Sequence, residues 1–169
     1  LMALQGVSFL WLRANLLDRV ALRLPGWRSA RDMWDFLDYS QPPAGDASRY
    51  EGGTPNILGA LSLATSIDVL ANAGVERIAA HVLALTDRLA EGLSVRGWTI
   101  LGDRSSDAVK SGILTFTRDG VDAVALGRQL QRDHGIVTTY RAKGVRIAPH
   151  GYNTGEEIDA ILAALPDVS

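Results

Sequence analysis

Cysteine is absent from the 169 residues of this chain. The absence excludes disulfide bonds, thiolate metal sites and cysteine nucleophiles within these residues. Lysine is also scarce, because the basic side chains are almost all arginine and only Lys110 and Lys143 are lysines. Both lie in polar stretches flanked by serine or glycine, whereas a nucleophilic lysine is buried and desolvated so that its pKa falls. Neither lysine is therefore a candidate for covalent catalysis.

No charge of one sign predominates. The 17 lysine and arginine residues and the 19 aspartate and glutamate residues give a formal net charge of -2, and they are interspersed along the chain. The sequence therefore predicts no surface for nucleic acid or for an anionic membrane. Its apolar runs are broken well before the length of a transmembrane helix, and its first residues lack the order of a signal peptide. We expect a globular, cytoplasmic protein.

The first half of the chain predicts a long loop between a strand and a helix. Residues 7–12 are rich in branched and aromatic side chains, which is typical of a buried strand, and a short helix is expected at residues 14–20. Residues 25–56 carry four of the six prolines and should form an irregular connection of the kind that often carries function. A helix then follows, with Gly74 as its stop. Its expected buried stripe comprises Ile57, Leu61, Ala64, Ile67 and Leu70.

The second half predicts a small α+β domain. A helix with helical spacing of apolar residues starts at Val75. The elements expected after it are strands at residues 98–101 and 112–117, a helix at 121–133 with Val124, Ala125 and Leu130 inward, strands at 136–140 and 145–148, and a last helix. A capping box formed by Thr154 and Glu157 marks the start of that last helix. This order predicts a largely antiparallel sheet with helices on one face.

Residues 51–56, Glu-Gly-Gly-Thr-Pro-Asn, are a candidate phosphate-binding turn. Two glycines permit a positive φ, so consecutive amides can converge on an anion. The hydroxyl of Thr54 adds a donor beside the start of the following helix. An ordinary turn followed by a helix cap is the alternative that these residues alone leave open.

Arg146 is a candidate carboxylate-binding residue. In an alternating strand its neighbours Val145 and Ile147 point to one face of the sheet, so its guanidinium points to the other. The planar guanidinium can hold a carboxylate with two parallel hydrogen bonds. A surface arginine with no ligand is the alternative.

The histidines predict no metal site, because His81, His134 and His150 are isolated and no pair has ligand spacing with a carboxylate. All three are expected to be structural. The acidic residues Glu156 and Glu157 lie in the first turn of the last helix, where the helix dipole favours negative charge. We therefore predict no catalytic side chain and no metal ligand in this chain.

Taken together, residues 49–56 and 146–159, about ninety residues apart, resemble the carboxy-terminal part of the class V aminotransferase family. This family of pyridoxal 5'-phosphate (PLP) enzymes includes cysteine desulfurases and proteins like isopenicillin N epimerase. Residues 1–11 are similar to the segment that follows the Schiff-base lysine of the family, so that lysine would lie about two residues before Leu1. The resemblance covers nearly the whole chain but only the last part of a complete enzyme.

The resemblance implies an α/β fold, the carboxy-terminal part of a PLP-dependent transferase. Residues 1–74 would be the remnant of the large PLP-binding domain, with its long loop and helix, and residues 75–169 the small α+β domain. In the family, the residues matching Gly53 and Thr54 contact the cofactor phosphate of the neighbouring subunit, which implies a homodimer. The residue matching Arg146 binds the α-carboxylate of the amino-acid substrate.

The missing lysine implies that the chain is inactive alone. Because the loop between the strands at 136–140 and 145–148 is short and has no cysteine, the resemblance leaves transamination, epimerisation or elimination open. The substrate also stays open. The alternative is a stand-alone, non-catalytic α+β module that derives from the family and binds a partner or a small anion.

Overall fold

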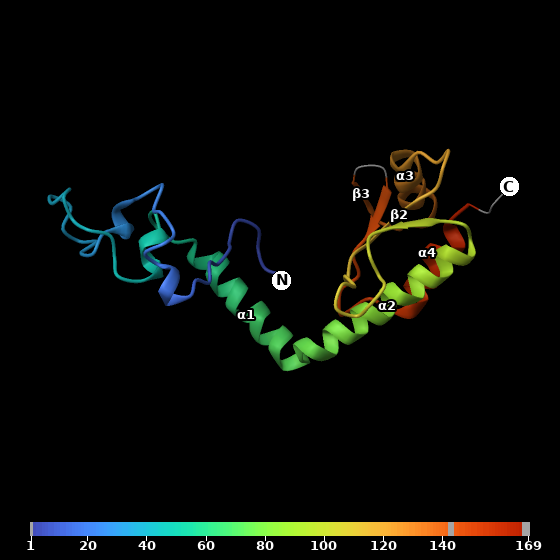
Figure 1. Ribbon diagram of the computed structural model, residues 1–169, viewed down its shortest axis with the longest axis horizontal. Helices are drawn as coiled ribbons and strands as arrows, with labels where there is room; N and C mark the ends of the chain where they lie inside the picture. Colours follow the sequence, from blue (N-terminus) through green and yellow to red (C-terminus); the bar gives the residue numbers. More distant parts are fainter. Residues whose placement is uncertain (1, 142–143, 167–169) are drawn as a thin grey trace. The chain divides into compact units, whose positions relative to one another are not determined.

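The computed structural model describes residues 2–141 and 144–166, and it divides into two compact units. The first unit spans Leu1–Asn72 and the second spans Ala73–Ser169. Helix α1 (Ile57–Ala73) belongs to the first unit, and its label is shown in Figure 1. All the strands that the structure describes belong to the second unit.

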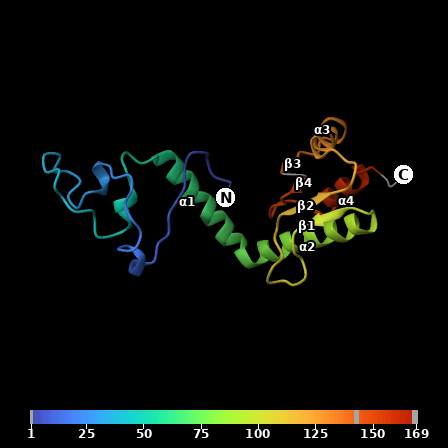
Figure 2. The ribbon, with the colours of Figure 1, turned by 45° about the horizontal axis from the view of Figure 1, so that its top comes forward.

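The second unit is a four-stranded antiparallel sheet with three helices, as the sequence predicts (Figure 2). Its elements in chain order are α2 (Val75–Val95), β1 (Thr99–Leu101), β2 (Leu114–Thr117), α3 (Ala123–His134), β3 (Thr139–Arg141), β4 (Gly144–Ile147) and α4 (Gly155–Ala164). The strand order is β1-β2-β4-β3, and every neighbouring pair is antiparallel. The predicted hairpin of β3 and β4 is therefore confirmed.

The core of the second unit lies on one face of this sheet. Phe116 is opposite both Ile100 and Val145, and Leu114 is opposite Ile147, so these five side chains share a face. The helices cover that face with the buried side chains Leu85, Leu89, Leu93, Leu126, Leu130, Ile158, Ile161 and Leu162. The prediction of helices on one face of the sheet is confirmed.

Helix α3 differs from the prediction in the face that it buries. The predicted inward residue Leu130 is buried, whereas Val124 and Ala125 are exposed and Leu126 is buried in their place. The Asp122 side chain accepts hydrogen bonds from the backbone amides of residues 124 and 125 and caps the helix there. The buried stripe begins at Leu126 and recurs four residues later, because these are the side chains of α3 that pack into the core.

The capping box of α4 is confirmed. The amide of Thr154 donates to Glu157 Oε2 over 2.8 Å, and the amide of Glu157 donates to Thr154 Oγ1 over 3.4 Å. These two bonds satisfy amides that have no partner within the helix. The cap fixes where α4 begins, and the predicted inward residue Ile158 is 2% exposed.

In the first unit, helix α1 has its predicted start but not its predicted buried stripe. Asn56 Oδ1 accepts a hydrogen bond from the Gly59 amide over 2.9 Å, which makes Asn56 the N-cap. The helix ends before Gly74, whose φ of 88° is accessible to glycine. The buried residues of α1 are Gly59 and Leu63, whereas Leu61, in the expected stripe, is 62% exposed.

Polar side chains of α1 hold the amino-terminal segment. Ser66 Oγ donates to the carbonyl of Met2 and Ser62 Oγ accepts from the amide of Leu4, while Asn56 Nδ2 donates to the carbonyl of Gly6. These contacts use the face of α1 that carries small and polar residues. The apolar stripe of α1 therefore lies uncovered within this unit.

The predicted strand at residues 7–12 is wrong for this chain. No strand is assigned there, and Phe9, Leu10 and Trp11 are all more than half exposed. A strand needs a neighbour to complete its ladder of hydrogen bonds. Among the described residues of the first unit, the only β contact is the isolated bridge between Ala30 and Pro43. Residues 25–56 form the predicted irregular loop, interrupted by short 3-10 turns at Trp27–Ser29 and Ala47–Tyr50.

Over residues 2–141 and 144–166, no single helix is long and apolar enough to cross a membrane. Only α1 and α2 taken as a bent pair have the length and apolar composition that a membrane span needs.

The difference in burial between α1 and α2 predicts that a leucine-to-alanine substitution destabilises the protein in α2 and has little effect in α1. Leu89 of α2 is fully buried in the core, so Leu89→Ala should lower the free energy of unfolding by about 2–5 kcal/mol. Leu61→Ala in the exposed stripe of α1 should change it by less than about 0.5 kcal/mol. Urea denaturation followed by circular dichroism measures both. Equal losses would contradict the difference in burial between the two leucines.

Candidate functional site

The Gly53–Thr54 turn in the first unit is fixed by the segment around Ser29. The amide of Gly26 donates to Ser29 Oγ over 3.0 Å, and Ser29 Oγ donates to the carbonyl of Glu51 over 3.1 Å. The Arg28 guanidinium lies 2.9 Å from the Glu51 carboxylate. A Cβ at Gly26 would stand 1.7 Å from the carbonyl oxygen of Gly52, so only glycine allows the two backbones to approach this closely.

Gly53 lies beside Trp27, and it does not use the backbone freedom that the sequence suggested. Neither Gly52 nor Gly53 has a positive φ, so the turn does not use the left-handed conformation that glycine permits. A Cβ at Gly53 would instead lie 3.4 Å from Nε1 of Trp27. Glycine therefore leaves open the space beside the indole N–H.

Hydrogen-bond donors are unpaired at this turn. Thr54 is exposed, and within the described residues neither its hydroxyl nor the indole N–H of Trp27 has a hydrogen-bond partner. Sequence reasoning missed Trp27, because its contact with Gly53 spans an irregular loop. The space beside Gly53 and the free donors around it suit an anion such as a phosphate.

Arg49, which precedes this turn, is committed to the structure of the loop. Its Nε donates to the carbonyl of Ala44 over 2.8 Å, and its Nη1 donates to the carbonyl of Leu17 over 3.1 Å. The hydroxyl of Tyr50 donates to the carbonyl of Val20 over 2.8 Å. Arg49 and Tyr50 thus tie the loop to the residues before it.

In the second unit, Arg146 points away from the core, as strand alternation predicts. Its neighbours Val145 and Ile147 are buried, while Arg146 itself is half-buried on the other face of the sheet. The Cα partners of Arg146 are Thr115 on β2 and Thr139 on β3. Nη1 of Arg146 donates to Thr139 Oγ1 over 3.2 Å.

Arg146 has no carboxylate partner in the part of the chain that the structure describes. Several other arginines do form ion pairs with acidic side chains, namely Arg28, Arg49, Arg88, Arg104 and Arg132. Its hydrogen bond to the neutral Thr139 hydroxyl does not neutralise the positive charge of Arg146. The guanidinium is thus available to a carboxylate from outside the chain.

Arg146 lines an open groove of about 460 Å³ at the edge of the sheet. The walls are otherwise mostly apolar and come from residues 135–139, the end of β4 and the first turns of α4. Glu157 is the other charged residue of the groove, but its Oε2 accepts hydrogen bonds from Asn153 Nδ2 and from the Thr154 amide. These bonds hold the pKa of Glu157 below its usual value. Arg146 therefore carries the uncommitted charge of the groove.

The histidines occupy separate structural positions. His81 Nε2 is hydrogen-bonded to the carbonyl of Asn153 over 2.8 Å, and the ring of His150 stacks on Tyr152 with centroids 4.9 Å apart. His134 is the last residue of α3. Within residues 2–141 and 144–166, no group of three or more histidine and acidic side chains is arranged to hold a metal ion.

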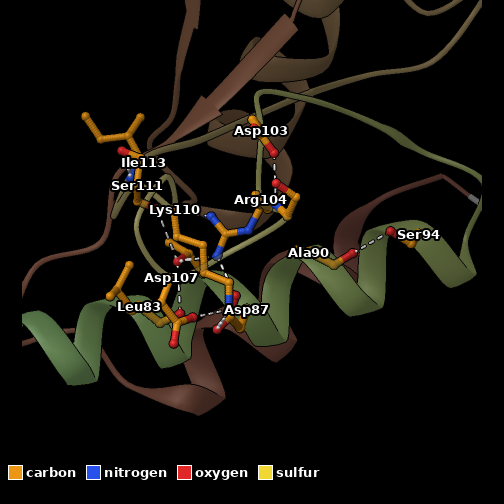
Figure 3. Close-up of polar contacts among 12 residues, drawn as sticks. Leu83, Asp87, Ala90, Ser94, Asp103, Arg104, Asp107, Lys110, Ser111 and Ile113 are labelled. Carbon is orange, nitrogen blue, oxygen red and sulfur yellow. Dashed lines mark hydrogen bonds and ion pairs between the residues drawn. The ribbon is translucent and has the colours of Figure 1, made fainter.

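Lys110 is held by two carboxylates, which Figure 3 shows. Its Nζ lies 3.0 Å from Asp107 Oδ1 and 3.1 Å from Asp87 Oδ2, while Arg104 Nη2 lies 2.6 Å from Asp87 Oδ1. Hydrogen bonds to Asp107 and to Asp87 raise the pKa of Lys110. A nucleophilic lysine needs the opposite shift. Lys143 lies outside the described residues.

The similarity to known proteins extends over most of the chain. Residues 1–161 match the aminotransferase class V family, and the chain belongs to that family. The resemblance that residues 49–56 and 146–159 predicted is confirmed.

The proteins that are similar in sequence to this chain carry different names. The kynureninase of Bacillus anthracis is 31% identical over 160 residues, which cover 90% of this chain and 36% of that protein. A probable cysteine desulfurase of Vibrio cholerae is 26% identical, with 95% of this chain and 41% of that protein covered. The chain thus spans about two fifths of the length of these relatives.

Solved structures give the same family and fold. The apo cysteine desulfurase from Thermococcus onnurineus has a TM-score of 0.77 and 26% identity, with 90% of this chain and 40% of that chain covered. The cysteine desulfurase CsdA of Escherichia coli covers 90% of this chain and 39% of its own, with a TM-score of 0.73 and 20% identity, which shows the fold alone. The predicted fold class, the carboxy-terminal part of a PLP-dependent transferase fold, is confirmed.

The carboxylate of Asp87 predicts a pH dependence of stability. Its hydrogen bond from Arg104, followed by that from Lys110, holds the pKa of Asp87 below its usual value. The stabilisation is therefore present above the unfolded pKa of about 3.9 and is lost as the pH falls through the folded pKa. Asp87→Asn should reduce this loss, and near neutral pH it should destabilise the protein by roughly 1 kcal/mol or less, because Asp87 is half exposed.

Urea denaturation between about pH 3 and pH 7 measures this difference. Asp119→Asn is the matched control, because Asp119 is exposed and forms no ion pair within the described residues. An identical pH dependence in Asp87→Asn and in the unsubstituted chain would contradict the assignment.

Proposed function

We propose that this chain is the carboxy-terminal part of a homodimeric, PLP-dependent enzyme that acts on an amino acid. Membership of the class V aminotransferase family supports the proposal, as do relatives named kynureninase and probable cysteine desulfurase. One structural neighbour, a mutant of C-DES, carries glycine linked covalently to its PLP cofactor. Residues 1–74 belong in this proposal to the large PLP-binding domain, and residues 75–169 form the small domain.

The observation that carries the proposal is Arg146 without an acidic partner among the described residues. A guanidinium on a rigid strand presents its donors in a fixed plane, and a carboxylate accepts two of them in parallel. A partner from the same chain would compete with the substrate for these donors. Since Thr139 is neutral, Arg146 keeps its full charge for the α-carboxylate of the amino acid.

The Gly53–Thr54 turn fits the phosphate of PLP. Its free hydroxyl, the indole N–H of Trp27 and the space that a Cβ on residue 53 would fill suit a small anion. In the proposed dimer this turn contacts the cofactor of the neighbouring subunit. When bound, PLP delocalises the negative charge that develops at the substrate Cα. The residues of this chain bind the phosphate and orient the substrate carboxylate.

The chain alone is inactive in this proposal, since Lys110 is paired with carboxylates and has a raised pKa. Transamination, epimerisation and elimination remain the candidate reactions, because they share the step at the substrate Cα. A non-catalytic binding module is the second candidate. The core of the second unit favours it, because all the residues of that core cluster belong to the second unit.

Substitution of Arg146 separates substrate binding from cofactor binding. In the complete protein, Arg146→Ala should weaken amino-acid binding roughly a hundredfold, since it removes the charged donors of a carboxylate. The affinity for PLP should change little. Spectrophotometric titrations with PLP and with the amino acid measure the two constants. Arg128→Ala, an exposed arginine on α3, is the control; an equal loss of both affinities in Arg146→Ala, or no loss, would contradict the substrate role.

Substitution of Thr54 should weaken the binding of PLP. Thr54→Ala removes one donor to the phosphate, and the affinity of the complete protein for PLP should fall by about tenfold. Dialysis against PLP-free buffer, followed by measurement of the retained cofactor, gives the result. Thr65→Ala is the control, because the Thr65 hydroxyl donates to the carbonyl of Leu61 within α1. Full cofactor retention in Thr54→Ala would refute the phosphate role.

A mixed dimer tests whether the phosphate contact comes from the neighbouring subunit. One subunit carries Thr54→Ala and the other carries Arg146→Ala. If Thr54 serves the opposite site and Arg146 serves its own, both substitutions fall in the same site and about half of the unsubstituted activity returns. If both residues serve their own subunit, each site is damaged, and activity stays low at PLP concentrations that do not saturate the Thr54→Ala site. The non-catalytic alternative predicts no activity in any dimer.

A further inference from the structure

The hydrogen bond from Arg146 to Thr139 is the contact that restrains the guanidinium within the described residues. An arginine side chain loses considerable rotational freedom when it is fixed in one orientation. Among those residues nothing else holds Arg146, because no carboxylate pairs with it and Nη1 is its bonded nitrogen. The 3.2 Å contact to Thr139 Oγ1 is thus the one that defines the orientation of the guanidinium.

Two threonines flank Arg146 on the same face of the sheet, but only one can orient it. The pairing of β4 places Thr115 on one side of Arg146 and Thr139 on the other. The hydroxyl of Thr115 has no partner in the described part of the chain. Its methyl group faces Gly144, since a Cβ there would lie 2.7 Å from Thr115 Cγ2. Thr115 thus provides a built-in control for Thr139.

We propose that Thr139 is a positioning residue for substrate binding. Its hydroxyl accepts a hydrogen bond from Nη1 of Arg146 and holds the guanidinium, so that the remaining N–H donors meet the substrate α-carboxylate. This inference rests on the function proposed above. A threonine suits the task because it fixes the orientation and leaves the positive charge uncompensated, whereas an acidic residue at position 139 would compete with the substrate.

The first test needs no ligand. In the chain of 169 residues labelled with ¹⁵N, relaxation of the Nε–Hε group of Arg146 reports how strongly the guanidinium is held. Thr139→Val should increase its motion, because valine keeps the branched shape and removes the acceptor. Thr139→Ser should restore the order, since serine keeps the hydroxyl. Thr115→Val should leave Arg146 as ordered as before. Equal order in Thr139→Val and in the unsubstituted chain would overturn the positioning role.

The second test measures binding in the complete, PLP-loaded protein with L-alanine and L-alaninamide as probes. The amide lacks the carboxylate, so it reports on binding that does not involve Arg146. Thr139→Val should raise the dissociation constant of L-alanine about fivefold and leave that of L-alaninamide unchanged. Thr139→Ser should recover most of the affinity. In an Arg146→Gln background, Thr139→Val should have no further effect, because it acts through the arginine.

The outcomes separate this inference from the function on which it rests. If Arg146→Gln leaves L-alanine binding unchanged, the substrate role of Arg146 fails. If Arg146→Gln weakens binding and Thr139→Val binds L-alanine as the unsubstituted protein does, the function stands and the positioning role is overturned. A loss in Thr139→Val that persists in the Arg146→Gln background would also overturn it, because the effect would not pass through Arg146.

Discussion

The pairing of β4 with β2 and β3 determines where Arg146 points, because it buries the residues on either side of it. Val145 lies opposite Phe116, and Ile147 lies opposite Leu114, in the core of the second unit. A slip of one residue would turn both apolar side chains to the open face and bring Arg146 into the core. The free-energy cost of burying an unpaired guanidinium excludes that register. Core packing thus sets the orientation of the candidate substrate-binding residue.

The first unit positions its turn by a different means. Its loop has little regular structure, and hydrogen bonds from Arg49 and Ser29 to backbone carbonyls hold it together. The close approach of Gly26 to the Gly52 carbonyl depends on glycine at position 26, and Trp27 lies beside Gly53. Hydrogen bonds to the backbone and the Gly26–Gly52 approach therefore constrain the Gly53–Thr54 turn, beside the packing of Trp27 on Trp34 and Phe36.

Elements with local signals were predictable from the sequence. Helix α4 carries a capping box, α2 repeats its leucines with helical spacing, and the β3–β4 hairpin joins two short strands. The orientation of Arg146 followed from alternation alone. Its bond to Thr139 did not, because the register of β3 depends on pairing that no local pattern specifies.

The errors share a physical cause, which is that burial depends on what lies opposite. The apolar stripe of α1 and residues 7–12 have the pattern of buried segments, but most of their large side chains are exposed within the first unit. In α3 the inward side chains are Leu126 and Leu130, which pack into the core of the second unit. The contact between Trp27 and Gly53 joins residues across a loop, so spacing did not reveal it.

A guanidinium that its own chain does not neutralise attracts any small anion in solution. Formate and acetate carry the same planar carboxylate group as an amino acid, and the groove beside Arg146 is open. The anion of the buffer salt therefore affects whether Arg146 is occupied. In the proposed function, a carboxylate buffer would compete with the amino-acid substrate for Arg146, whereas a buffer with bulky anions would not.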